Sequence, residues 1–134
     1  MDIKYIHKSD KEYMYRALEE AKKSDMRSKH GCIIIDKNGN IISIGYNKTI
    51  PTIDKKIFNK KNIDKSVKVS IHAEEHALKT TDPRKLYGAK LYVIRWGYAE
   101  SNPVFMNSKP CKRCTCIIKT CMKKYGLKVA YYTT

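Results

Sequence analysis

Two short segments combine residue types that could bind a metal ion and move a proton. They are His72–Glu74, with the sequence HAE, and Pro110–Cys114, with the sequence PCKRC. Imidazole and thiolate groups are preferred zinc ligands, and three protein ligands leave a fourth position open for chemistry. His72, Cys111 and Cys114 are therefore predicted to bind one catalytic zinc ion (Zn²⁺).

Glu74 lies two positions after the predicted histidine ligand, and its carboxylate could serve as a general base. Two thiolates would cancel the charge of the zinc ion, so the metal would be a mild Lewis acid that benefits from a nearby base. Acid–base help of this kind accelerates a reaction by about 10²–10⁴-fold. Glu74 is therefore the predicted catalytic residue. The alternative is that Glu74 has a structural role only and stabilises a helix N-terminus.

Seven predicted elements must position these two segments. They are a helix that begins at a capping box of Ser9 and Glu12 and ends near Ser24, helices over residues 71–80 and 110–125, and strands over residues 31–36, 41–47, 89–95 and 127–132. Asn38-Gly39 is a strong hairpin signal between the first two strands. The last two strands are each reached through a helix, and right-handed crossovers make such strands parallel. We expect an α/β fold with three α/β/α layers and a mixed sheet, formed as a single domain over residues 1–134.

Two segments are expected to be irregular. Trp96–Lys109 contains Gly97 and an Asn-Pro pair, and it separates the third strand from the third helix. Lys55–Lys68 contains six lysines and one acid, Asp64. This lysine loop is either a solvated surface or a lip that faces a phosphate beside the site.

Composition narrows the class of protein. The chain has 134 residues and a net charge of +15, and its longest unbroken apolar run, Cys32–Ile35, is four residues. A membrane-spanning helix needs about 20. The N-terminus has no apolar stretch of the kind that directs secretion, so we expect a cytoplasmic protein with reduced cysteines and no membrane partner. The charge would attract polyanions and phosphorylated small molecules, or it reflects a lysine-rich composition alone.

Three further residues have alternative interpretations. His72 and His76 fit the inverted zinc-protease pattern H-x-x-E-H, but that hypothesis leaves the cysteine pair unexplained. Cys121 lies on the apolar stripe of the third predicted helix, which favours a buried core thiol. Cys116 is predicted to be a free surface thiol, although a closed structural site that includes it is an alternative.

The two segments together resemble the zinc deaminases, whose signature is H-x-E followed by P-C-x-x-C. The chain is similar to the cytidine/deoxycytidylate deaminase superfamily from about Gly31 to its C-terminus. GCIIIDKNGNIISIGYN resembles the hairpin of that family, whose second strand ends in Gly-x-Asn, and the branch that it most resembles is deoxycytidylate deaminase. The resemblance implies hydrolytic removal of an exocyclic amine, with Glu74 passing a proton from water to the base and later to the departing ammonia.

The resemblance also implies substrate contacts. Asn47, at the end of Gly45-Tyr46-Asn47, is expected to hold the sugar, and the backbone at Ala73 is expected to hold the base. We also expect Pro110 and Arg95 to contact the substrate, Arg95 by reaching a phosphate from the end of its strand. Ser108 and Lys109 are weaker candidates for the same rim.

The leading functional hypothesis is deamination of a cytosine nucleotide, most simply dCMP to dUMP. One alternative is a deaminase that acts on cytosine or adenine in RNA or single-stranded DNA, with the lysine loop contacting the backbone. Another is a non-catalytic zinc module that binds nucleic acid. Homo-oligomers are common among relatives, and a sheet with an open edge favours self-association.

Overall fold

The computed structural model describes residues 2–5, 11–50, 69–99 and 102–133. The lysine loop, Lys55–Lys68, therefore lies outside the described residues. The elements in the described ranges are β1 (Asp2–Tyr5), α1 (Lys11–Ala21), β2 (Lys29–Ile35), β3 (Ile41–Tyr46), β4 (Lys48–Ile50), β5 (Val69–Ile71), α2 (Ala73–Thr80), the 3₁₀ helix η2 (Pro83–Leu86), β6 (Lys90–Ala99), β7 (Asn102–Met106), α3 (Lys112–Tyr125) and β8 (Val129–Tyr132). None of the helices in this part of the chain combines the length and apolar character needed to cross a bilayer.

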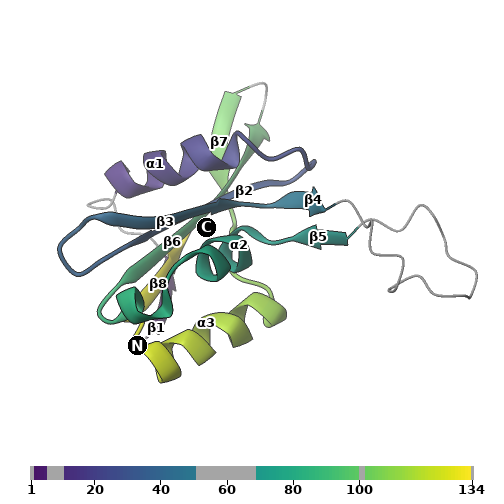
Figure 1. Cartoon of the computed structure of the whole chain (residues 1–134). Coiled ribbons are helices and arrows are strands. Elements are labelled where there is room, and N and C mark those ends of the chain that lie inside the picture. The colour runs from purple at the N-terminus through teal and green to yellow at the C-terminus, as the bar shows by residue number, and fades with distance from the viewer. Residues whose placement is uncertain (1, 6–10, 51–68, 100–101, 134) are drawn as a thin grey trace, which may run out of the picture.

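A six-stranded mixed sheet forms the centre of the molecule (Figure 1). Its strand order is β1-β8-β6-β2-β3, and β7 pairs with the far end of β6. The predicted hairpin of β2 and β3 is antiparallel, and β6 and β8 are parallel. Both predictions are therefore confirmed. A separate two-stranded ribbon of β4 and β5 extends from the end of β3.

The expectation of only four strands is wrong. β1 is a short strand that pairs in parallel with β8, and its four residues are too few for a periodic signal. The segment expected to be irregular after Arg95 is a β-hairpin, in which β6 continues to Ala99 and β7 returns beside it. Pro103 lies in β7, which within the described residues pairs with β6 alone. Edge strands of this kind are where proline is tolerated in a sheet.

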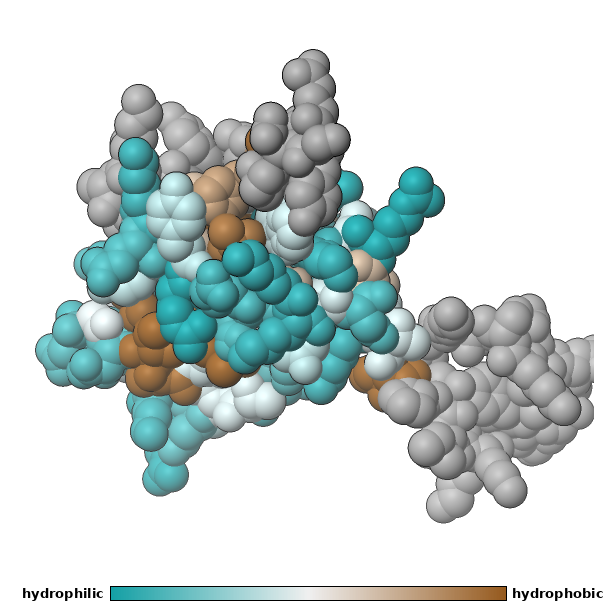
Figure 2. Space-filling model, turned by 90° about the horizontal axis from the view of Figure 1, so that it is seen from above, coloured by the Kyte–Doolittle hydropathy of each residue, from teal (hydrophilic) through white to brown (hydrophobic). Residues whose placement is uncertain are grey.

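The sheet has a helical layer on each face, as expected for three α/β/α layers (Figure 1). Ile33 and Ile35 of β2 belong to the core under α1, whereas Cys32 and Ile34 belong to the core under α2 and α3. This alternation follows from the two-residue period of a strand. Seen from the α1 side, most of the described surface is hydrophilic, and hydrophobic residues form only small groups (Figure 2).

Gly45 determines how closely α2 approaches the sheet. A Cβ atom at this position would lie 2.6 Å from the carbonyl oxygen of Ala73, in the first turn of α2. Such contacts do not occur in real structures, so any larger residue would push α2 away from β3. The glycine therefore allows the end of α2 that carries the HAE segment to lie close against β3.

The helices that carry the two motifs begin later than predicted. α2 begins at Ala73 after an extended N-cap residue, His72, and α3 begins at Lys112 after the extended N-cap residue Cys111. The predicted starts, at residues 71 and 110, are therefore wrong by two positions. Pro110 precedes the cap instead of occupying the first turn. α3 ends as predicted at Gly126, whose φ of 79° suits glycine.

Candidate metal centre and active site

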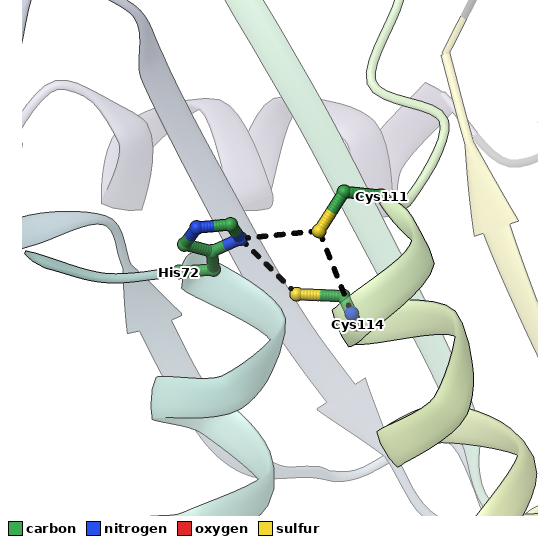
Figure 3. A group of neighbouring side chains, drawn as sticks. All are labelled: His72, Cys111 and Cys114. Carbon is green, nitrogen blue, oxygen red and sulfur yellow. Dashed lines mark hydrogen bonds between the residues drawn. The ribbon is translucent and has the colours of Figure 1, made fainter.

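Three side chains from the two motifs converge at the N-terminal ends of α2 and α3 (Figure 3). Nδ1 of His72 lies 3.5 Å from Sγ of Cys111 and 3.3 Å from Sγ of Cys114. All three atoms lie within 4.8 Å of one another, and they form the one such group of His, Cys, Asp or Glu found in the described part of the chain. The structure thus brings together the three predicted ligands.

This donor set fits zinc in both geometry and charge. Ligand atoms at zinc bond lengths of about 2.0–2.3 Å in a tetrahedral site lie about 3.3–3.8 Å apart, and the two measured separations fall in this range. Burial, the Glu74 carboxylate and the Cys111 thiol raise the pKa of Cys114 well above its usual value. A divalent cation bound to the sulfur would offset the free-energy cost of ionising this thiol and would stabilise its thiolate form.

Hydrogen bonds to the sheet hold the segment that leads into α3. The Ser108 hydroxyl donates to the carbonyl oxygen of Val93 at 2.8 Å, and the Ser108 amide donates to the carbonyl oxygen of Thr133 at 2.8 Å. These contacts tie the segment to β6 and to the residue after β8. Cys111 then accepts a hydrogen bond from the Cys114 amide at 3.5 Å, so the cap itself orients one predicted ligand.

Glu74 is a nearly buried carboxyl group beside the three ligands, with 5% of its surface exposed. Burial raises its pKa above the ordinary value, while hydrogen bonds with its own backbone amide and with Cys114 act in the opposite direction. A carboxyl group in such surroundings exchanges protons nearer to neutral pH than a solvated one does. Its placement suits the predicted role of a proton shuttle.

A cavity of about 280 Å³ opens above this group. It is near the lower end of the volumes, about 300 Å³ and above, that hold small ligands in proteins. Its lining residues come from the loop before β2, from β2, β5 and α2, and from the segments that flank them: Met26, Ser28, His30, Asn47, Ser70, His72, Ala73, Glu74, Ser108, Lys109 and Cys111. The predicted base and two of the predicted ligands, His72 and Cys111, therefore face one cavity.

Comparison with known proteins agrees with this geometry. The sequence model described as "Cytidine and deoxycytidylate deaminase zinc-binding region" matches residues 7–128. The chain belongs to the cytidine and deoxycytidylate deaminase family. Zinc is the metal that this family region binds, and His72, Cys111 and Cys114 are the group placed to bind it. No curated protein matches the chain.

Solved structures show the same fold. The dCMP deaminase of cyanophage S-TIM5 in its apo form has a TM-score of 0.59 and 26% identity, with 95% of this chain and 84% of that chain covered. The same phage enzyme in complex with dCMP and dUMP has a TM-score of 0.58 and 24% identity, with 96% and 83% covered. The three-layer α/β/α architecture is therefore the cytidine deaminase fold.

The residues expected to contact substrate in this deaminase family member differ in their placement. Ala73 and Asn47 line the cavity, but the Asn47 side chain already accepts a hydrogen bond from the His30 amide at 2.8 Å and donates to the Ser28 carbonyl oxygen at 2.6 Å. Pro110 is buried and does not line the cavity. Arg95 does not line it either, although it pairs in register with His30, which does.

His30 is a cavity residue that the sequence reasoning missed. Burial and the positive charge of Arg95 lower the pKa of His30 to about 4, so the imidazole is neutral at physiological pH. The local sequence Lys29-His30-Gly31 carries no signal for this role. Only the pairing of β2 with β6, which is a tertiary feature, sets His30 opposite Arg95 at the site.

Glu75 is a second residue that the sequence reasoning missed, and it links the two helices that carry the ligands. Its Oε2 lies 2.7 Å from the Arg113 guanidinium of α3 and 3.1 Å from Nζ of Lys79. Burial acts to raise the pKa of Glu75, but the two cations outweigh it and hold the pKa below its usual value. Arg113 lies between the two cysteines of the PCKRC segment, so this ion pair fixes the helix ends that bring the ligands together.

We expect the Glu75–Arg113 contact to have a measurable coupling energy. In a double-mutant cycle with Glu75→Gln and Arg113→Met, the coupling in the free energy of unfolding should be about 0.5–2 kcal/mol, because the two groups are in contact and one is buried. Chemical denaturation of the zinc-loaded protein measures it. A coupling near zero would mean that the pair does not hold the two helices together.

The other residues considered from sequence have structural roles. Nδ1 of His76 accepts a hydrogen bond from the Tyr46 amide at 3.1 Å, and its ring packs against the Tyr46 ring. His76 is therefore a contact between α2 and β3, and it is absent from the metal-binding group. Cys121 is buried in the core and Cys116 is exposed, as predicted.

Proposed function

We propose that this protein is a zinc-dependent hydrolytic deaminase that converts a cytosine nucleotide, dCMP, to dUMP. One water is consumed and one ammonia is released for each base. The observation that carries the proposal is that a buried carboxylate, Glu74, and two of the metal ligands line one small cavity. Structural zinc sites are usually closed and do not face a ligand-sized cavity with an acid beside them.

In this proposal His72, Cys111 and Cys114 hold the metal, and Glu74 moves the protons. Zinc bound there would supply Lewis-acid chemistry that lowers the pKa of a water molecule. The Glu74 carboxylate would accept a proton from the attacking water and deliver it to the ring nitrogen of cytosine as the water oxygen bonds to C4. It would then take the second proton from the resulting C4 hydroxyl and give it to the C4 amine, so that the C–N bond breaks, the C4 carbonyl forms and ammonia leaves. The raised pKa of Glu74 favours this sequence, because the group must be both a base and an acid.

Arg95 favours a phosphorylated substrate over a nucleoside. Its Nε is buried and has no hydrogen-bond partner among the described residues. Arg95 pairs directly with His30 across β6 and β2. Two residues that lie opposite each other on paired strands have their side chains on the same face of the sheet. An arginine without a protein acceptor beside a cavity is well suited to bind a phosphate. Lys109, which lines the cavity, adds a second positive charge.

The proposed phosphate contact gives a sharp prediction. Arg95→Met should lower kcat/KM for dCMP by about 10- to 100-fold, because charge-assisted hydrogen bonds to phosphate would be lost. The value for deoxycytidine should change by less than about threefold, since the nucleoside has no phosphate to lose. Steady-state deamination of both compounds measures this.

A matched control is Arg84→Met, since Arg84 pairs with Asp82 and does not line the cavity. It should leave both substrates unaffected. Equal losses for dCMP and deoxycytidine in Arg95→Met would contradict the phosphate contact, while leaving the deaminase proposal intact.

The proposal as a whole is tested by ammonia release from a substrate panel. The panel contains cytidine, deoxycytidine, CMP, dCMP, dCTP, single-stranded DNA and tRNA. Turnover that is highest on dCMP supports the proposal. Turnover on a polymer alone would favour a nucleic-acid deaminase, and zinc binding without turnover on any compound would favour the non-catalytic module.

A further inference from the structure

The positive charge of the chain is unevenly distributed along the sequence. From Ser101 to the C-terminus there are seven lysines and arginines and no aspartate or glutamate. Most of these cations lie on α3, which contains five of them. The excess charge is therefore concentrated on one structural element in this part of the chain.

The lysines of α3 point away from the core. The buried residues of the helix are Cys114, Ile118, Cys121 and Met122. Lys112, Lys119 and Lys123 are exposed and follow one another at spacings of seven and four residues, which place them on one side of a helix. At 1.5 Å per residue the spacings are about 10 and 6 Å. We call this side, with the neighbouring Lys124, the α3 basic face.

The helix on the opposite face of the sheet has a different charge pattern. α1 contains three glutamates among its eleven residues and only two cations. Lys22 and Lys23, just after α1, pair with Glu19 and Glu20. Within the described residues, Arg113 is the one cation of α3 that forms an ion pair. A lysine-rich composition alone would give both helices an excess of positive charge. It therefore does not explain why α3 has no acidic residue while α1 has three.

An exposed aromatic residue lies at the C-terminal end of the α3 basic face. Tyr87 is 73% exposed. The Tyr87 ring packs over the helix end, because a Cβ atom at Gly126 would lie 2.6 Å from its Cδ2. Unpaired bases stack on such exposed rings, while lysines beside them contact the phosphates.

We propose that the α3 basic face, together with Tyr87, binds single-stranded nucleic acid. The lysines would contact successive phosphates along the helix, and Tyr87 would stack with a base at its end. The face begins at the N-terminus of α3, beside the cavity, and continues away from it. The proposed binding is therefore separate from the deamination of a free nucleotide, and it would hold whether or not dCMP is the substrate.

Fluorescence anisotropy with a labelled oligothymidylate tests the proposal. The triple variant Lys119→Gln, Lys123→Gln, Lys124→Gln should bind at least about tenfold more weakly at low salt, because three phosphate contacts are lost. The slope of log affinity against log salt should fall by about 2, since each contact with a single strand contributes about 0.7. Tyr87→Ser should weaken binding of the single strand by about tenfold and leave binding of a duplex unchanged.

The matched control removes the same charge elsewhere, with Lys11→Gln, Lys22→Gln and Lys37→Gln. It should reduce oligothymidylate binding by less than about threefold, because only long-range attraction is lost. Neither triple variant changes a residue of the proposed catalytic machinery, so both should deaminate dCMP at the rate of the unmodified protein. Failure of dCMP turnover in all proteins would contradict the proposed function without affecting the binding result.

Three outcomes would overturn the proposal. Equal losses in the two triple variants would show that binding depends on net charge and not on this face. Tighter binding to duplex than to single strand would contradict the role of Tyr87. Binding to phosphatidylserine vesicles that depends on the α3 lysines, without oligothymidylate binding, would assign the face to an anionic membrane.

Discussion

Glu74→Gln is expected to abolish most of the turnover while leaving the metal in place. The substitution keeps the size of the side chain and removes its ability to accept a proton. Loss of a general acid–base group costs about 10²–10⁴-fold in rate, and here one group serves several proton transfers, so the upper part of that range is expected. Ammonia release from dCMP measures the rate, and atomic absorption measures zinc per protein chain.

The outcome separates three hypotheses for the site. If the site is a structural zinc module, Glu74→Gln should change neither zinc content nor any other measured property. If the protein is a deaminase, turnover should be lost while the zinc content stays unchanged. Glu19→Gln is the matched control, because it makes the same chemical change on α1, at a residue that does not line the cavity. A Glu74→Gln protein with full zinc and full turnover would show that another group shuttles the proton.

The sequence predicts the candidate site well because the chemistry depends on local order. His72 caps α2 and Cys111 caps α3, and the Cys-x-x-Cys spacing brings Cys114 back to the same helix end. Such relations hold within a few residues and need no knowledge of the rest of the chain. β3 and β6 each pair antiparallel with β2, so they run in the same direction, and α2 and α3 come after their carboxyl ends. This brings the two helix starts to one edge of the sheet.

The rest of the site could not be predicted because it depends on strand pairing. His30 faces the cavity opposite Arg95 only because β2 and β6 pair in one particular register. Ser108 lines the cavity as expected, but its hydroxyl bonds to the Val93 carbonyl oxygen and it is 2% exposed. No local pattern shows whether a serine before a helix faces a ligand or anchors a segment to the sheet.

The missed strands have a similar explanation. β1 contains only four residues and is stabilised by its neighbour β8, so its existence is a tertiary effect. In the β6–β7 hairpin, Gly97 and Pro103 hide the strand signal although both are compatible with an outer pairing. Glycine and proline indicate irregular structure in most sequences. That indication is misleading at the margin of a sheet, where a strand does not need ladder hydrogen bonds on both sides.

Loss of a single thiol at the metal centre is expected to remove zinc and destabilise the fold. Cys111→Ala and Cys114→Ala should each fall to well below one zinc per chain, with the free energy of unfolding reduced by at least about 3 kcal/mol, because part of the metal-binding free energy is folding free energy. A chelator should lower the Tm of the unmodified protein and leave the Tm of both variants nearly unchanged. Zinc content and thermal melting, with and without chelator, measure these effects.

The same helix supplies a control for each of these variants. Cys116 is exposed like Cys111, and Cys121 is buried like Cys114, but neither belongs to the metal-binding group. Cys116→Ala should therefore keep full zinc and a normal Tm, and Cys121→Ala should lose stability only by the cost of a small cavity while keeping full zinc. If Cys121→Ala lost zinc as Cys114→Ala does, metal loss would follow from disturbed packing of α3. In that case the assignment of Cys114 as a ligand would no longer follow from its loss of zinc, and Cys111, whose exposed thiol can be removed without a cavity, would decide the ligand set.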